Sequence, residues 1–339
     1  MWGQPVRNAS AVAARLGHHE VMSGVAAPAA RVHAAAERRP VVLVCIGVVL
    51  FSVGPVLFAS ADASGQVIAF WRLVFGVLIL GGATVAYVTV TGRRPTVRGW
   101  VWSIRAGFAF VANQLFFLAA LRATSVADVT LMQVLQPVLV AILAVPLFGE
   151  RPGSRFRLWS LVAVAGAAVV ALGGSSGPEG DPVGMACAIA SIVLFALYFV
   201  WSKQAREEID TWPFLFGVSA TGLVVVSISF LVTGGSPGEA HGHDIVLALV
   251  IAAGPGAIGH FVSTWPLRWV PANVPPLLQL AIPFLATGLA WLVLHQSIRP
   301  GHVIGGSITM VGVAGALRSP AGRRLVAREE VILATQSAE

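Results

Sequence analysis

The chain has 339 residues, of which 56% are hydrophobic and only 11% are charged, and its mean hydropathy is +0.81. Because a soluble domain carries about 25% charged residues, this composition excludes a soluble enzyme or binding module and indicates an integral membrane protein. The net charge of +7 does not indicate a nucleic-acid partner, because the basic residues form short clusters between apolar runs and not one basic face.

The apolar runs are about 20 residues long, the length that crosses a hydrocarbon core about 30 Å thick. Residues 1–39, rich in Ala and Arg, and residues 319–339 are expected to form two cytoplasmic tails. The first apolar run has no convincing cleavage site, so we expect it to be retained as a helix. Between the tails the sequence predicts ten transmembrane helices, at 41–59, 66–90, 100–121, 125–148, 156–174, 183–202, 212–233, 244–266, 273–294 and 301–317.

Lysines and arginines are distributed unequally between the two ends of these helices. An even number of spans places both termini on one side, and 18 of the 22 basic residues fall on that side, whereas only Arg122 and Arg299 fall on the other. Cytoplasmic loops carry such an excess of positive charge. We therefore expect a multi-pass protein of the inner, cytoplasmic cell membrane with both termini in the cytoplasm.

Residues 121–144 and 267–290 align with each other without a gap at a shift of 146 residues. Gln133 and Pro137 align with Gln279 and Pro283, and apolar composition alone does not explain a shared amide four residues before a shared proline. The alignment predicts two five-helix repeats, at 40–174 and 182–318, joined by a linker at 175–181. Because five is odd, the second repeat enters the membrane from the opposite side, an inverted arrangement typical of secondary transporters.

Polar side chains inside these helices should face protein or a hydrated cavity, because lipid offers them no partner. Pro137 and Pro283 are each predicted to kink a span, which is tolerated where the freed carbonyls face such a cavity. Arg72 could bind a substrate carboxylate through two hydrogen bonds, or it could reach an internal carbonyl or the membrane interface. The candidate substrate-binding residues are Arg72, Asn113, Gln114, Gln133, Gln136, Tyr198, His260, Trp265 and Gln279.

Each glutamine could equally form an ordinary hydrogen bond between helices that holds the bundle together. Asp128 and His260 are the candidate proton-coupling groups, since both can exchange a proton in a membrane setting. The alternatives are that Asp128 lies at the start of its helix or in an outer vestibule, and that His260 only forms a hydrogen bond inside the bundle. The two cysteines lie in separate apolar runs, and we expect no metal and no cofactor.

The first half ends in PVLVAILAVPLFGERP, which contains the pair Gly149-Glu150. This segment, with ten spans in two halves, resembles the EamA-type transporters of the drug/metabolite transporter superfamily, and the resemblance covers residues 41–318. It implies a helical bundle with a cavity between the halves, and export of a small metabolite, amino acid or drug-like compound, often driven by the proton gradient. The second half has His295-Gln296 where the family carries Gly-Glu, which argues against a symmetric role for Glu150.

Two other classes of function remain as alternatives. The segment GGSSG at 173–177 has the spacing of an intramembrane serine protease around Ser176, although a Gly-rich helix exit is more typical of a flexible loop. A channel-type facilitator would carry a filter or rings of charge, and no such pattern is present. We therefore predict a secondary active transporter, not an enzyme, that moves a small molecule across the lipid bilayer by alternating access. Protons are its candidate coupling ion, and it is expected to be a monomer or homodimer.

Overall fold

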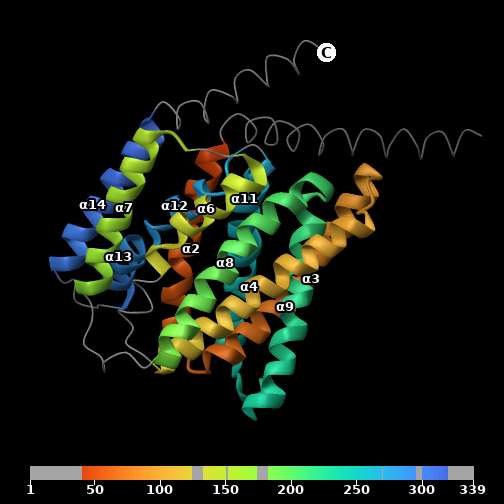
Figure 1. Cartoon of the computed structure of the whole chain (residues 1–339). Coiled ribbons are helices and arrows are strands. Elements are labelled where there is room, and N and C mark those ends of the chain that lie inside the picture. Colours follow the sequence, from red (N-terminus) through yellow and green to blue (C-terminus); the bar gives the residue numbers. More distant parts are fainter. Residues whose placement is uncertain are drawn as a thin grey trace, which may run out of the picture.

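The computed structural model of the chain describes residues 40–123, 133–149, 152–173, 182–268, 270–294 and 300–319. In these segments every regular element is a helix and none is a strand, which confirms the prediction of an all-α protein. The long helices lie side by side in a bundle, and the described chain starts and stops at the same end of it (Figure 1).

Five α-helices form the described part of the first half: α2 (Pro40–Ala59), α3 (Gly65–Thr91), α4 (Val97–Ala123), α6 (Gln136–Phe148) and α7 (Ser154–Gly173). Local sequence signals set some of their ends. The hydroxyl of Ser64 accepts a hydrogen bond from the backbone N–H of Val67 at the start of α3. Gly92 and Gly149 end α3 and α6 in the left-handed conformation, with φ of 68° and 66°, where a glycine carries no steric penalty.

The second half is less regular, because it contains three short non-α segments. Its elements are α8 (Pro182–Glu208), α9 (Thr211–Thr233), the 3-10 turn η1 (Pro237–Glu239), α10 (Gly242–Ile251), the π-helical segment η2 (Ala252–Gly259), α11 (His260–Thr264), the 3-10 turn η3 (Trp265–Arg268), α12 (Val274–Gln279), α13 (Ile282–Leu294) and α14 (Pro300–Arg318).

Two spans that were predicted as continuous helices are interrupted. The span predicted at 244–266 is divided into α10, η2, α11 and η3, and the span predicted at 273–294 is divided between α12 and α13. Proline accounts for both, because it has no N–H to donate and its ring crowds the preceding turn. Pro255 lies inside η2, where the hydrogen bonding shifts to the wider π register, and Pro283 lies directly after the turn between α12 and α13.

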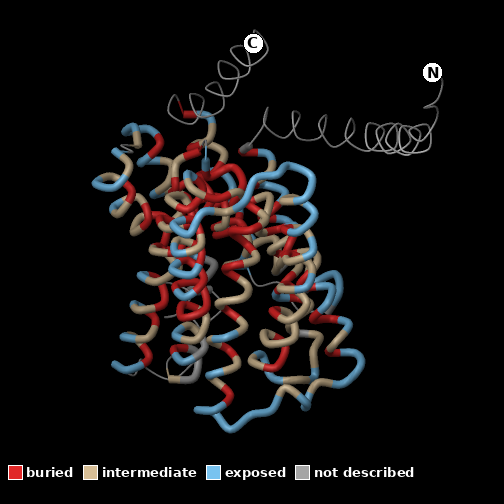
Figure 2. Tube along the Cα trace, turned by 90° about the vertical axis from the view of Figure 1, so that its right-hand side faces the viewer, coloured by how far each residue is buried: buried red, intermediate tan, exposed pale blue. Residues whose placement is uncertain are grey.

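Within the described part of the chain, six helical segments are long and apolar enough to cross a membrane: Val41–Phe58, Gly65–Thr91, Pro182–Glu208, Thr211–Thr233, Gly242–Arg268 and Val274–Val293. Gln136–Phe148 and Val303–Arg318 are apolar but shorter. Many large apolar side chains point away from the protein, among them Leu231 and Val232, which are 86% and 84% exposed. Figure 2 shows buried residues along the inside of the bundle and exposed residues on its outer faces and ends. Such a surface suits contact with lipid, because soluble monomers rarely expose large apolar patches.

The helices of the two halves pack against one another in corresponding pairs. The first helix of the first half, α2, packs on the α10–α11 segment and on α12–α13, whereas the first helix of the second half, α8, packs on α4 and α6. The second helices, α3 and α9, pack on each other. In Figure 1 α2 and α8 run in opposite directions along the bundle.

The last helices of the two halves, α7 and α14, form a pair with their backbones in contact. A Cβ atom at Gly312 would lie 2.3 Å from the backbone nitrogen of Ala163, and one at Gly166 would lie 2.4 Å from that of Thr309. Small residues four apart, such as Ala163 and Ala167 on α7 and Gly312 and Ala316 on α14, let the two backbones approach closely. These small residues therefore pack within the chain.

Candidate functional site

A cavity of about 320 Å³ lies between the two halves of the chain. Its walls come from α2, α3 and α4 of the first half and from α8, α10, η2, α11, α12 and α13 of the second. The aromatic side chains that line it are Phe51, Phe58, Phe110, Phe195, Tyr198 and Phe199. The polar side chains that line it are Arg72, Gln114, His260, Ser263, Thr264 and Gln279. Ligand sites combine an apolar wall and a few polar groups in this way.

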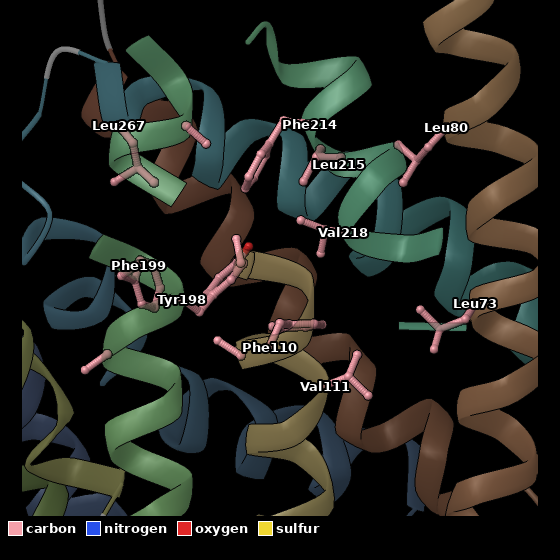
Figure 3. Packing of buried hydrophobic residues seen from close by; sticks show 14 of the residues in the cluster. Leu73, Leu80, Phe110, Val111, Tyr198, Phe199, Phe214, Leu215, Val218 and Leu267 are labelled. Carbon is pink, nitrogen blue, oxygen red and sulfur yellow. The ribbon is translucent and has the colours of Figure 1, made fainter. Parts of the chain in front are cut away.

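The aromatic wall is a packed cluster centred on Phe110 and Tyr198. Figure 3 shows these two rings between α4 and α8, with Phe199 beside Tyr198. The centroids of Phe110 and Tyr198 are 4.9 Å apart, and the ring of Phe195 lies parallel to that of Tyr198 at 5.8 Å. Because each ring is held by its neighbours, this wall offers an ordered apolar surface to a ligand.

Arg72 brings a guanidinium group to the cavity. It is the eighth residue of α3, so it lies roughly 10 Å from the start of the helix at a rise of 1.5 Å per residue. One terminal nitrogen, Nη2, donates a hydrogen bond to Oε1 of Gln114 at 3.3 Å. The Nε atom is buried and has no partner among the described residues. Arg72 thus keeps donor capacity for another group.

His260 enters the cavity directly after the π-helical segment. The ring contacts two phenylalanines edge to face, with centroids 4.9 Å from Phe51 and 5.1 Å from Phe110. A π-helix holds one extra residue within its turn, so it rotates the side chains that follow it, and such segments are frequent at functional sites. The sequence shift of 146 residues pairs His260 with Gln114, and both of these side chains line the cavity.

The paired glutamines differ in their surroundings. Gln133 donates through Nε2 to Oγ of Ser191 at 3.0 Å, and Ser191 donates to Oδ1 of Asn113 at 2.7 Å. This chain of hydrogen bonds, the Gln133–Ser191–Asn113 chain, joins α4, α8 and the segment before α6, and none of its members lines the cavity. Gln279, in contrast, lies in the cavity wall.

The equivalent hydrogen-bonded chain around Gln279 cannot form, because a glycine replaces its asparagine. Gly259 occupies the position that corresponds to Asn113. Gly47 of α2 packs there, since a Cβ atom on it would lie 3.2 Å from the carbonyl oxygen of Gly259 and 2.1 Å from Oγ of Ser263. Gly47 and Gly259 therefore let α2 approach the η2–α11 segment closely.

Of the other predicted residues, Gln136 and Trp265 are buried but do not line the cavity. Gln136 is the first residue of α6, and its Nε2 atom has no partner among the described residues. Trp265 lies in the η3 turn. Asp128, the other proton-coupling candidate, lies outside the described residues, as do Ser176 and Glu150.

The two predicted helix-kink residues, Pro137 and Pro283, each lie near the start of a helical segment. Pro137 is the second residue of α6 and comes after a turn at Leu135. Pro283 is the second residue of α13 and comes after the turn that ends α12. In the first turn of a helix the missing N–H has no intrahelical acceptor to satisfy, so proline is tolerated there.

The structure adds wall residues that the sequence analysis did not select: the phenylalanines at 51, 58, 110, 195 and 199 and the hydroxyls of Ser263 and Thr264. Phenylalanine is common on every face of a membrane helix, so its identity gave no signal. Ser263 and Thr264 did offer one, because two adjacent hydroxyls close to His260 interrupt an otherwise apolar run.

Comparison with known proteins agrees with this architecture. The chain is 25% identical over 278 residues to an uncharacterized transporter of Archaeoglobus fulgidus, an alignment that covers 81% of this chain and 95% of the relative. A solved crystal structure shares the fold with a TM-score of 0.71 at 20% identity, covering 82% of this chain and 98% of that one. The EamA-like transporter family matches twice, at residues 38–172 and 182–318. Since these two matches span most of the sequence, the chain belongs to the EamA-like transporter family.

Proposed function

We propose that the protein is a secondary active carrier that moves a small molecule by alternating access through the cavity between its two halves. The observation that carries this proposal is the cavity itself, because it combines Arg72, Gln114 and Gln279 with an aromatic wall and takes residues from both repeats. A site at the junction of two repeats is the arrangement found in secondary transporters.

The proposed repeats, at 40–174 and 182–318, are inverted with respect to each other and contribute ten spans in total. The opposite directions of α2 and α8 and the corresponding helix pairs support this arrangement. Inversion matters for function, because one unit placed in both orientations allows an outward-open and an inward-open state of similar energy.

Contacts at the two ends of the bundle correspond in the same way. At one end, the buried carboxylate of Asp244 accepts hydrogen bonds from the backbone N–H groups of Asp62 and Ala63, at 2.9 and 3.2 Å. At the other end, Arg98 forms an ion pair with Glu208 at 3.2 Å. The shift of 146 residues converts Asp62 to Glu208 and Arg98 to Asp244, so equivalent positions are in contact at both ends.

These end contacts suit a carrier that opens to one side at a time. In Figure 1 the α2–α3 and α9–α10 connections lie at one end of the bundle, and the α3–α4 and α8–α9 connections lie at the other. The Asp244 clamp is our name for the contacts of the Asp244 carboxylate with the backbone N–H groups of Asp62 and Ala63, at the end of the α2–α3 connection. Opening of one end breaks one set of contacts and leaves the equivalent set intact.

Counterflow in proteoliposomes tests the transport proposal. Vesicles preloaded with an unlabelled substrate should transiently accumulate the same substrate, added in labelled form outside, above its external concentration. The initial rate of uptake should saturate as the external concentration rises. A channel would give neither trans-stimulation nor saturation, and that result would refute the carrier. Liposomes without protein are the control for leak. Liposomes with the Gln279→Ala variant are the control for the cavity.

The positive-inside distribution supports a cell-membrane protein with both termini in the cytoplasm. The inverted topology requires residues 93–98 and 239–243 to lie on opposite faces of the membrane. Cysteines introduced in these two segments should therefore react with an impermeant maleimide from opposite sides. Labelling of both from the same side would rule the topology out.

Proton coupling and export complete the proposal, and both are what the resemblance to this family implies. His260 in the cavity and Asp128 are its candidate coupling groups. An imposed pH difference should then drive accumulation of substrate in proteoliposomes. If accumulation does not depend on the pH difference, neither residue couples transport to protons, and the protein catalyses facilitated exchange only.

A further inference from the structure

We propose, on the basis of the proposed transport function, that the substrate is an organic monoanion: a carboxylate joined to an apolar body of about the size of one aromatic ring. Arg72 is the anchor for its carboxylate. The aromatic wall around Phe110 holds its body.

The positive charge of Arg72 has no counter-charge in the described part of the cavity wall. Among the described residues its guanidinium donates a hydrogen bond to the neutral amide of Gln114, and its buried Nε has no partner. No described residue that lines the cavity is acidic. A buried cation without a counter-charge is costly, and a carboxylate offers two oxygens that match the planar fork of a guanidinium.

The guanidinium of Arg72 borders two hollows of different size. Arg72, Phe110 and His260 also line a second, smaller hollow of about 30 Å³. That hollow has room for water only, whereas the main cavity of about 320 Å³ falls at the lower end of the range for small-molecule sites, roughly 300–1,000 Å³. The substrate is therefore small, and its charged end meets Arg72 from the main cavity.

The rest of the cavity wall is mainly apolar. Six aromatic rings line the cavity, and the stacked pair Phe195 and Tyr198 lies beside Phe110. A fully polar anion such as phosphate or a small dicarboxylate would leave this surface unmatched. An aromatic or branched body would bury it, with ring contacts that favour offset or edge-to-face packing.

The charge of the cavity wall also disfavours cationic and zwitterionic ligands. A cation would face the like charge of Arg72, and no described acidic group in the wall would balance it. A zwitterion would gain the carboxylate contact, but only neutral groups such as Gln279, Ser263 and Thr264 would meet its ammonium group. The expected order of affinity is anion above zwitterion, and zwitterion above neutral amide and cation.

Four compounds test this order: 3-phenylpropanoate, L-phenylalanine, 3-phenylpropanamide and 2-phenylethylammonium. In each of them two carbon atoms separate the phenyl ring from the carboxylate, amide or ammonium group. Their binding is measured by titration calorimetry on the full-length protein in nanodiscs. The carboxylate should bind at least tenfold more tightly than the amide, and the ammonium compound should not bind. Equal binding of carboxylate and amide, or tightest binding of the ammonium compound, would overturn the proposal without the need for any variant.

Variants then test the anchor. Arg72→Gln should bring the carboxylate within about threefold of the amide, whereas Arg72→Lys should keep part of the preference because the charge remains. Arg105→Gln is the matched control, because Arg105 lies on α4 outside the cavity wall, exposed, and over the ring of Trp102 at 4.9 Å. An equal loss of preference in Arg105→Gln would show a general effect of net charge and refute the role of Arg72.

Binding and counterflow together separate this proposal from the transport function. The expected order of binding without counterflow would leave the ligand class intact and refute the carrier. Counterflow of cations or neutral compounds, with no preference for carboxylates, would leave the carrier intact and refute the ligand class.

Discussion

Removal of the Asp244 carboxylate should open the cavity to the side of the α2–α3 connection. Its carboxylate accepts three backbone hydrogen bonds, from Asp62, Ala63 and His241. The bond from His241 caps α10 itself and survives in any state, whereas the other two join α10 to the α2–α3 connection. Each of these two bonds to a charged acceptor is worth roughly a factor of ten in an equilibrium, so Asp244→Ala should raise the open population by roughly 30- to 100-fold.

The reactivity of a cysteine in the cavity wall measures this opening. Ser263→Cys suits the purpose, because Ser263 lines the cavity and its hydroxyl has no partner among the described residues. Cys45 and Cys187 are replaced by alanine to remove background labelling. An impermeant maleimide added from the α2–α3 side should label Ser263→Cys much faster when Asp244→Ala is present.

Asp62→Ala is the matched control, because Asp62 contributes only its backbone N–H to the Asp244 clamp and its side chain is exposed. Asp62→Ala removes a carboxylate beside this contact but keeps the backbone N–H that takes part in it, so it should leave the labelling rate unchanged. If Asp244→Ala labels no faster than the parent, or if Asp62→Ala labels equally fast, the clamp does not hold this end closed.

Three further predictions concern the polar groups and the helix contacts. Ser191→Ala should lower thermal stability by about 1–2 kcal/mol with unchanged ligand affinity, whereas Gln279→Ala should weaken binding with little loss of stability, and calorimetry with unfolding curves separates the two. His260→Gln should abolish accumulation driven by a pH difference yet keep counterflow, and persistence of the driven accumulation would remove it as the coupling group. Gly312→Ala should destabilise the protein by about 1–3 kcal/mol, because its Cβ would meet the backbone of α7, whereas Gly82→Ala, which meets open space, should not.

The sequence predicted the general architecture because membrane helices follow directly from hydropathy. Long apolar runs gave α3, α8 and α9 nearly at their observed starts, since a lipid environment leaves the backbone few alternatives to a helix. The sequence did not predict that η2 takes the π register, because Pro255 between two glycines fits a kink, a break or a π turn equally well. Packing against α2 and α3 selects among these outcomes, and it involves residues distant in the sequence.

The candidate site could be predicted only in part, for a similar reason. Polarity inside a span identified Arg72, Gln114, His260 and Gln279, all of which line the cavity. Polarity alone could not separate Gln279 from Gln133, because the difference lies in what each amide meets: a cavity for one, and the hydroxyl of Ser191 for the other.

That difference between the halves leads to a last prediction, about Gly47. A Cβ atom on this residue would lie 2.1 Å from Oγ of Ser263 and 3.2 Å from the carbonyl oxygen of Gly259. The serine hydroxyl can rotate, but the carbonyl cannot, so Gly47→Ala should push α2 slightly away from α11. Since the Phe51 ring lies one turn further along α2 and contacts His260, this displacement should also loosen the cavity wall.

A double variant separates these effects. Gly47→Ala alone should lower both the thermal stability and the affinity for the ligand. Addition of Ser263→Gly removes the 2.1 Å clash, so it should recover most of the lost stability, while Ser263→Gly alone should gain nothing. Recovery by the pair beyond the sum of the single effects would show that close approach of α2 and α11 sets the geometry of the cavity. Strict additivity would show that the contact between Gly47 and Ser263 does not set the geometry of the cavity.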